Sequence, residues 1–205
     1  MILYSFGDSH RFHLSGYPIE GLSVIPNKGN SWTMARFGNE KLTLLNIKEC
    51  GVNEGDAVIF CFGEIDCRCH LCRKGVFEDY KGVIHYLCNN YFEAIKKNVD
   101  QYKDLKVLVF NVVPAVRLTK EMAEKWGEDA TEVFPFRGTD EQRKTVVNYM
   151  NKVLAAKCKD YDYTFVDVHD KYTDADGYFD VTKKDIHSHI KVKTYVSDFL
   201  KEIFK

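Results

Sequence analysis

The residues with the clearest chemical potential are Gly7-Asp8-Ser9-His10, which directly follow the apolar run Ile2-Leu3-Tyr4-Ser5-Phe6. A strand that ends here would expose the Ser9 hydroxyl at the carboxyl edge of a sheet, where open α/β folds bind their ligands. A serine hydroxyl becomes a good nucleophile only when a base takes its proton. Residues of the types required lie near the end of the chain, at Asp185, His187 and His189. Serine early and acid plus histidine late is one of the chain orders that can build a Ser-His-Asp site.

Polar and glycine residues also follow the next two apolar runs. Pro26-Asn27-Lys28-Gly29-Asn30-Ser31 follows the second run, and Gly63-Glu64-Ile65-Asp66-Cys67-Arg68 follows the third. The backbone N–H groups of Ser9 and Gly29 are candidate donors to an oxyanion, with Asn30 as a further candidate. We therefore expect the oxyanion and the substrate to be bound by residues from these three strand ends: Asp8, Gly29, Asn30, Gly63, Glu64, Asp66 and Arg68.

Strand-like and helix-like stretches alternate along the chain. The apolar runs predict strands at 2–6, 22–25, 57–62, 107–113 and 163–168, and helical periodicity predicts helices at about 78–101, 139–158 and 191–204. Thr139 and Gln142 have the spacing of a capping box. This alternation predicts a single domain over residues 1–205, with a three-layer α/β/α architecture and a central parallel five-stranded sheet. Residues 117–138 have the weakest pattern and are expected to form an excursion over the sheet.

The chain resembles the SGNH/GDSL hydrolases in the order and strand context of these blocks. Asp8-Ser9 fits the family's opening Gly-Asp-Ser, Gly29 fits its glycine block, and Gly63 and Asp66 fit part of its Gly-x-Asn-Asp block. The resemblance implies a flavodoxin-like SGNH hydrolase fold, a Ser9 nucleophile, and an Asp-His pair near the C-terminus. Gly63-Glu64-Ile65-Asp66-Cys67-Arg68 is similar to a variant block of a subgroup often encoded near glycan-building enzymes.

The chain departs from the family pattern at two places. Ile65 stands where the family has its oxyanion-hole asparagine, and Asp185 precedes His187 by two residues and His189 by four, not by three. His189-Ile190-Lys191 resembles the family's apolar and then polar residue after the histidine, which favours His189 as the base. His187 stays an alternative, and Asp185 orients the imidazole in either case.

Each candidate also has a structural interpretation. Asp8 or Ser9 would serve as an N-cap of the following helix, and Gly63 and Asp66 would form an ordinary strand-to-helix turn. Arg68 could form a surface ion pair, hold Asp66 and a loop in place, or bind an anionic or acyl-carbonyl group. Glu64 is either a second acid/base or a solvated carboxylate.

The cluster Cys67-Arg68-Cys69-His70-Leu71-Cys72 contains zinc-ligand residue types. Structural zinc sites usually combine two ligand pairs separated by a longer spacer, and no second pair follows here. Buried thiols are therefore the favoured interpretation, with no metal and no cofactor expected. His10 and His13 flank Ser9 and could contact a ligand, and Phe134-Pro135-Phe136 could line a sugar-binding cleft, although ordinary packing is favoured for both.

The overall composition excludes several classes of function. The 29 Lys+Arg against 30 Asp+Glu give a formal net charge of −1, without the basic stripe of a nucleic-acid-binding protein. No apolar run approaches the ~20 residues that cross a bilayer. Without an evident signal peptide, the seven cysteines are expected to be reduced thiols of a cytoplasmic protein. The oligomeric state stays open.

The predicted function is a serine esterase of SGNH type acting on a small acyl ester, for which O-acetyl on a carbohydrate is the expected example. Hydrolysis and acyl transfer to a sugar hydroxyl are both open. The alternative is a non-hydrolytic glycan-processing protein that keeps the fold, as a glycan-binding module or a glycosyltransferase-like enzyme using Asp8, Glu64 or Asp66. A zinc-dependent protein built on residues 67–72 is a third, weaker hypothesis.

Overall fold

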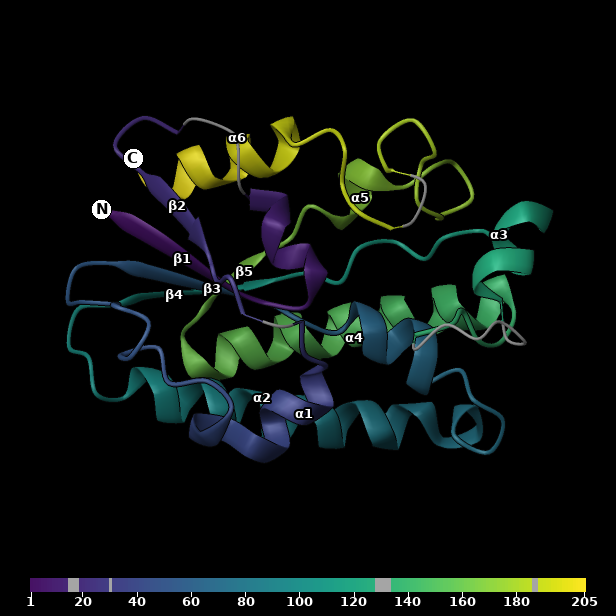
Figure 1. The fold of residues 1–205 in the computed structure, drawn as a ribbon, viewed down its shortest axis with the longest axis horizontal. Coiled ribbons are helices and arrows are strands. Elements are labelled where there is room, and N and C mark those ends of the chain that lie inside the picture. The colour runs from purple at the N-terminus through teal and green to yellow at the C-terminus, as the bar shows by residue number, and fades with distance from the viewer. Residues whose placement is uncertain (15–18, 30, 128–133, 186–187) are drawn as a thin grey trace.

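Five parallel strands form the centre of the molecule, in the order β2-β1-β3-β4-β5 (Figure 1). This computed structural model describes residues 1–14, 19–29, 31–127, 134–185 and 188–205. The strands are β1 (Ile2–Gly7), β2 (Ser23–Pro26), β3 (Ala57–Cys61), β4 (Lys106–Phe110) and β5 (Thr164–Val166). Because all strands run in the same direction, their carboxyl ends meet at one edge of the sheet.

The strands are apolar on both faces because helices cover both faces. Val58 and Phe60 of β3 face one core, and Ile59 and Cys61 face the other. The first core is completed by α1 (Met34–Glu40), α2 (Tyr80–Val99) and α4 (Asp140–Tyr161). The second is completed by the 3-10 helix η1 (Ser9–Leu14), α3 (Lys120–Trp126), α5 (His169–Tyr172) and α6 (Thr194–Ile203). Figure 1 shows α1, α2 and α4 on one side of the sheet and α6 on the other.

Three short helical segments complete the described elements. They are the 3-10 helices η2 (Lys41–Thr43) and η4 (Phe77–Asp79) and the π-helix η3 (Asp66–His70). The π-helix lies directly after the loop that leaves β3, so it positions part of the third polar block.

The predicted architecture and parallel sheet are confirmed. The capping box is also confirmed: Thr139 Oγ1 accepts from Gln142 N, and the Gln142 side chain accepts from Thr139 N. The predicted fifth strand is shorter than expected, because its ladder with β4 ends at Val166. Helices α1 and α3 were not predicted. Each is seven residues long, too short for a clear periodicity, and begins at a threonine cap, Thr33 or Thr119.

The stretch 117–138 is only partly described, since residues 128–133 lie outside the described residues. Its first part contains α3. At its end, Phe136 is buried while Phe134 is more than a third exposed, so the packing interpretation holds for Phe136. No helix in the described part of the chain is both long and apolar enough to cross a membrane.

Candidate active site

Gly7 lets the backbone leave β1 in close contact with β3. Its φ is +156°, and a Cβ atom added there would lie 1.9 Å from the Cys61 carbonyl oxygen. The next amide, Asp8 N–H, donates to the same Cys61 oxygen at 3.1 Å. A side chain at position 7 would force the backbone of β1 away from the Cys61 carbonyl oxygen. This close contact of the two strands fixes the position of Ser9 at the end of β1.

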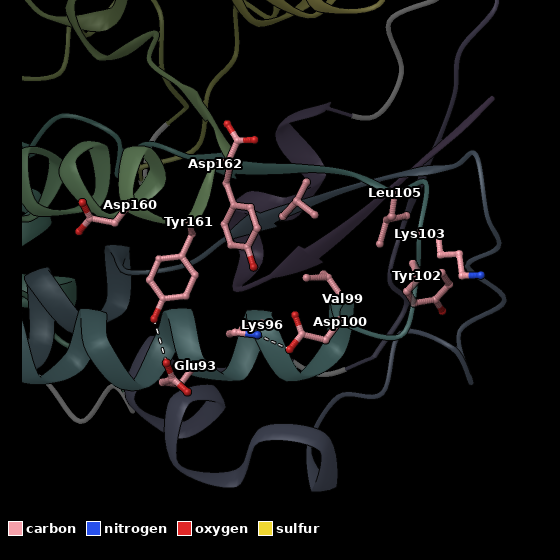
Figure 2. Close-up of a pocket in the computed structure, with 12 residues that line it drawn as sticks. Glu93, Lys96, Val99, Asp100, Tyr102, Lys103, Leu105, Asp160, Tyr161 and Asp162 are labelled. Atoms are coloured by element: carbon pink, nitrogen blue, oxygen red, sulfur yellow. Dashed lines mark hydrogen bonds and ion pairs between the residues drawn. The ribbon is translucent and has the colours of Figure 1, made fainter.

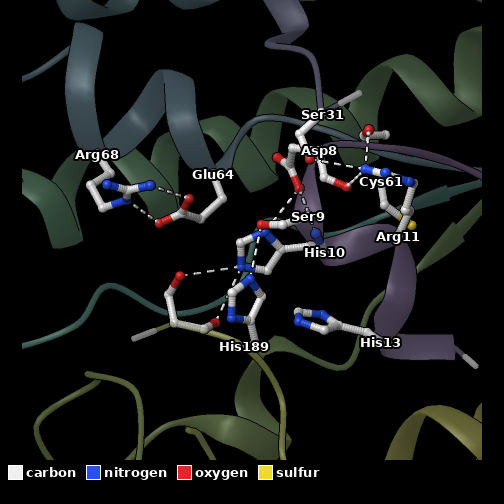
Figure 3. Close-up of polar contacts among 12 residues, drawn as sticks. Asp8, Ser9, His10, Arg11, His13, Ser31, Cys61, Glu64, Arg68 and His189 are labelled. Atoms are coloured by element: carbon white, nitrogen blue, oxygen red, sulfur yellow. Dashed lines mark hydrogen bonds and ion pairs between the residues drawn. The ribbon is translucent and has the colours of Figure 1, made fainter. Parts of the chain in front are cut away.

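Ser9, His189 and Asp185 form a continuous chain of hydrogen bonds (Figure 3 labels Ser9 and His189). Ser9 Oγ lies 2.9 Å from His189 Nε2, and His189 Nδ1 lies 3.0 Å from Asp185 Oδ2. Ser9 and His189 are half-buried, and Asp185 is exposed. The order of contacts is that of a nucleophile, a base and an orienting acid.

The spacing of four residues between Asp185 and His189 is explained by the pairing of the residues that flank positions 186–187. Lys184 and Ile190 form an antiparallel bridge, and Asp185 N–H donates to the His189 carbonyl oxygen at 2.9 Å. The His189 N–H in turn donates to Asp185 Oδ1 at 3.0 Å. Asp185 and His189 therefore lie opposite each other, with their side chains in contact. The alternative base, His187, lies outside the described residues.

The expected oxyanion donors differ in availability. The Ser9 N–H has no acceptor among the described residues. The Gly29 N–H, by contrast, donates to Asn27 Oδ1 at 2.9 Å. Gly29 could serve an oxyanion only if this bond broke, so its predicted role is not supported in this conformation. Asn30 lies outside the described residues.

Arg11 is a structural residue of the site that the sequence analysis missed. Its guanidinium donates to the carbonyl oxygens of Gly7 at 3.1 Å, Asp8 at 2.7 Å, Asn27 at 2.7 Å and Gly29 at 2.5 Å. It therefore ties the loop after β1 to the loop after β2. Burial lowers the pKa of Arg11, against the effect of the Asp8 carboxylate. The only sequence signal was an arginine in an otherwise apolar and histidine-rich turn.

Asp66, which the sequence predicts as a substrate-binding residue, contacts the N-terminus of α1. Its carboxylate accepts from Met34 N at 2.7 Å and from Ala35 N at 3.1 Å, at the N-terminus of α1. Burial raises the pKa of Asp66 to about 6. Both oxygens accept backbone N–H groups and Asp66 is 1% exposed, so these contacts support a structural role.

Glu64 and Arg68 form a buried ion pair at the end of β3. Arg68 Nε lies 2.7 Å from Glu64 Oε1, and a second guanidinium nitrogen lies 3.3 Å from Oε2. Arg68 also donates to the Phe134 carbonyl oxygen and lies 4.6 Å from the centre of the Phe136 ring. Of the roles predicted for Arg68, the structure thus shows the one that holds a loop. The loop it holds is the chain around Phe134, whereas Asp66 is held by α1.

Gly63 allows the chain to turn sharply between β3 and Glu64. Its φ is +113°, and an added Cβ would lie 2.9 Å from Val112 Cγ2. The strand-to-helix turn predicted for Gly63 is therefore present, and it faces the end of β4.

A small cavity lies beside Asp8 and is lined in part by His10, Glu64 and Asn111. It has room for about one water molecule. One oxygen of Asp8 accepts from the His10 backbone and ring, both at 2.8 Å, whereas Oδ2 is buried without a partner among the described residues. Asp8 is thus a buried carboxyl group that contacts both the backbone and the ring of His10, so the helix-capping interpretation describes only part of its contacts.

The cysteines of the segment 67–72 are buried thiols, as the favoured interpretation predicted. Cys67 and Cys72 pack in the core with α2 and α4. Burial raises the pKa of Cys69 to about 12 and that of Cys72 to about 11. In the described segments, no group of His, Cys, Asp or Glu has the arrangement needed to hold a metal ion.

A larger pocket lies at the opposite edge of the sheet (Figure 2). Its residues precede or begin β4 and β5, and include Tyr102, Leu105, Tyr161 and Tyr163. Tyr161 donates to Glu93 at 2.8 Å across it. Since Ser9 follows the carboxyl end of β1, this pocket is remote from the Ser9–His189 pair.

The fold and the placement of Ser9 together define the class of protein: a three-layer α/β protein with a histidine-bonded serine at the carboxyl edge of a parallel sheet. The same architecture is found in solved structures of other proteins. The chain has the fold of the SGNH/GDSL lipolytic and acylhydrolase proteins. A GDSL-like lipase from Bacteroides thetaiotaomicron matches with a TM-score of 0.59 and 13% identity, over 99% of this chain and 84% of the lipase.

Two further structures match almost from end to end. A carbohydrate acetylesterase from Sinorhizobium meliloti has a TM-score of 0.55 and 14% identity, covering 99% of this chain and 97% of its own. A phospholipase A1 from Streptomyces albidoflavus has a TM-score of 0.56 and 10% identity, with the same coverage of 99% and 97%. No family model matches the sequence. No curated protein matches it significantly.

Proposed function

We propose that this protein is a serine esterase of SGNH type that uses Ser9 as nucleophile, His189 as general base and Asp185 as orienting acid. The observation that carries the proposal is the Ser9–His189 contact of 2.9 Å, continued by the His189–Asp185 contact of 3.0 Å. The first distance lies in the range in which a base can take a proton from a nucleophile, and the second is a hydrogen-bond distance that would orient the base.

The first half-reaction follows from these contacts. His189 Nε2 takes the proton from Ser9 Oγ while this oxygen attacks the ester carbonyl carbon. The Ser9 N–H, which has no acceptor among the described residues, donates to the oxyanion that forms. His189 then returns the proton to the leaving alcohol, and the acyl group stays on Ser9.

The second half-reaction decides between an esterase and a transferase. Water, activated by His189, releases the acyl group as an acid in hydrolysis. A sugar hydroxyl in the same position would take the acyl group instead. The chemistry needs no metal or organic cofactor in either case.

The proposed substrate is a small acyl ester, with O-acetyl on a carbohydrate as the expected example. The S. meliloti structure of the same fold is that of a carbohydrate acetylesterase. A non-hydrolytic glycan-processing protein is the second candidate, favoured by the buried Ile65 in place of an amide donor and by the occupied Gly29 N–H.

Labelling with a fluorophosphonate probe, read by intact mass, separates the two candidates. We expect stoichiometric labelling of the wild type, loss of labelling in Ser9→Ala, and full labelling of Ser23→Ala, which removes an exposed serine of β2. A folded wild-type protein that is not labelled would contradict the esterase. If labelling succeeds, p-nitrophenyl acetate compared with p-nitrophenyl octanoate tests the preference for a small acyl group, and peracetylated xylose tests the carbohydrate.

A further inference from the structure

Two histidines of η1 contact the backbone on either side of His189. His10 Nε2 lies 3.2 Å from the carbonyl oxygen of Ser188, and the N–H of Ile190 donates to His13 Nε2 at 3.0 Å. Both rings are buried, at 4% exposure for His10 and 3% for His13. Figure 3 shows both rings close to His189. The segment 188–190, which carries the proposed base, is thus attached to the helix that begins at Ser9.

The contacts of His10 require both of its ring nitrogens to carry hydrogen. Nδ1 lies 2.8 Å from Asp8 Oδ1, and Nε2 faces the Ser188 carbonyl oxygen. A carboxylate and a carbonyl oxygen only accept hydrogen bonds, so an imidazole that satisfies both is the doubly protonated cation. The Ser188 hydroxyl, at 3.4 Å, is a more distant contact.

The charges around His10 favour this cation. Burial by itself lowers the pKa of His10, but the Asp8 carboxylate, its hydrogen bond and the Glu64 carboxylate outweigh burial and raise the pKa above its usual value. The Glu64 charge is shared with Arg68. The ring of His10 also lies near that of His189 in the C-terminal segment, with the two ring centres 5.0 Å apart.

His13 has the opposite requirement. Its Nε2 accepts the Ile190 N–H, so this nitrogen must carry no hydrogen, and the neutral ring holds its hydrogen on Nδ1. Burial, together with the nearby His10, His189 and Lys193, lowers the pKa of His13 well below its usual value. Protonation of His13 would turn an acceptor into a donor and break the contact with Ile190.

We propose that His10 and His13 form a histidine clasp, in which a doubly protonated His10 holds Ser188 and a neutral His13 holds Ile190, so that His189 is positioned against Ser9. Its catalytic consequence rests on the proposed function, whereas its structural part rests on the contacts alone. His10 and His13 are positioning residues: they contact the backbone of Ser188 and Ile190, which flank the base, and act on the reaction only through His189. The clasp is complete only while His10 keeps its proton, so it opens at alkaline pH.

Nuclear magnetic resonance of the ¹⁵N-labelled full chain tests the structural part without any substrate. Near pH 7 we expect the two ring nitrogens of His10 to show the shifts of an imidazolium, and His13 to show a neutral ring with hydrogen on Nδ1. Assignment uses the variants His10→Gln and His13→Gln. A neutral His10 or a protonated His13 at this pH would overturn the clasp.

The rate of Ser9 labelling by the fluorophosphonate, followed from pH 6 to pH 10, tests the positioning role. We expect the wild-type rate to fall at alkaline pH, and His10→Gln to have a rate lower by about ten- to a hundredfold at pH 7 without that alkaline fall. His13→Leu, which has no acceptor, should lower the rate similarly, and His13→Gln should restore it because its amide oxygen accepts from Ile190. The control His85→Gln alters an exposed histidine of α2 and should match the wild type.

The outcomes separate this inference from the proposed function. An unlabelled wild type whose histidines show the expected protonation states would contradict the esterase and leave the clasp standing as a structural device. A labelled wild type with the same pH profile in His10→Gln would overturn the clasp and leave the esterase standing.

Discussion

At the scale of single residues, the candidate site depends on side chains that make a hydrogen bond with each of their polar atoms. His189 is the clearest example, because one ring nitrogen contacts Ser9 and the other contacts Asp185. The Asp185 carboxylate can only accept a hydrogen bond, so it fixes the hydrogen of a neutral His189 on Nδ1 and leaves Nε2 free to take the serine proton.

Replacing Asp185 by asparagine tests this assignment. The amide can present its NH₂ group to His189 Nδ1, which favours the wrong tautomer of the base. We expect the rate of Ser9 labelling to fall by at least about a hundredfold, with little change in stability because Asp185 is exposed. Asp170→Asn, which changes a fully exposed carboxylate beside another histidine, is the matched control and should keep the wild-type rate. Equal rates in the two variants would rule out the orienting role.

Gly7 allows a second prediction at the residue scale. Gly7→Ala places a Cβ atom 1.9 Å from a backbone oxygen, so β1 and β3 must separate. Gly75 also has a positive φ, +82°, but a Cβ atom added there has no atom within 4 Å, so Gly75→Ala tests the backbone conformation without the contact. In urea unfolding we expect Gly75→Ala to lose about 1 kcal/mol and Gly7→Ala to lose at least about 3 kcal/mol or fail to fold. Similar losses in both would show that the contact with Cys61 can relax.

At the scale of elements, buried polar side chains decide how the short segments are attached. Asp66 caps α1 from the π-helix η3, and Arg68 holds the chain at Phe134 from the same helix. The segment after β3 therefore organises two neighbouring loops, which explains why its polar residues are buried.

Asp66 makes stability depend on pH in an unusual direction. Its pKa is about 6 in the folded protein because of burial, against ~3.9 for an unperturbed aspartate. The folded state therefore holds a proton that the unfolded state has lost between these values. The stabilisation is complete below about pH 4 and is lost as the pH rises through 6, by about 2–3 kcal/mol in total.

The variant Asp66→Asn isolates this effect. Its amide keeps an acceptor for α1 but does not titrate, so we expect the free energy of unfolding of the wild type to decrease relative to that of the variant between pH 4 and pH 7. Urea unfolding at several pH values measures the difference. A difference that stays constant with pH would contradict the assigned protonation of Asp66.

The helices and strands also show which parts of the structure local sequence patterns can predict. The long amphipathic helices α2 and α4 and the continuous apolar strands were predictable, because burial of a repeated face leaves a clear period. The short helices α1 and α3 and the π-helix were not, since caps and contacts with distant residues stabilise them. Asp66 appeared as a candidate ligand residue for the same reason: its partners are 31 and 32 residues away.

At the scale of the whole molecule, two apolar cores on either side of the sheet enclose most of the thiols. Six of the seven cysteines are buried and only Cys50 is exposed. Burial also raises the pKa of the core thiols, as for Cys88 to about 12, which keeps them as unreactive thiols.

A thiol titration tests this enclosure. With Ellman's reagent at pH 8 we expect about one reactive thiol in the native protein and all seven after unfolding in guanidinium chloride without reductant. Cys50→Ser should remove the native reactivity, and Cys88→Ser should leave it unchanged. Three or more rapidly reacting native thiols would show that the segment 67–72 opens, and fewer than seven after unfolding would reveal disulfides.

The sequence by itself determined the fold class, and it indicated Ser9 near one end of the chain and Asp185 and His189 near the other as candidate partners. Apolar strands alternating with amphipathic helices leave few other ways to bury both faces of a sheet. The placement of Gly-Asp-Ser after the first strand also predicts an exposed serine at the ligand-binding edge. The prediction of the fold class succeeds because it depends on neighbours along the chain, whereas the predicted exposed serine is half-buried at that edge.

Only the tertiary structure decided which groups meet at that edge. The contact of Ser9 with His189, 180 residues away, depends on how the segment 188–190 packs on η1. The structural roles of Arg11 and Asp66, and the opposite protonation of His10 and His13, depend on acceptors and donors brought from distant segments. A side chain's partners set its pKa and its role, and those partners become neighbours only when the chain has folded.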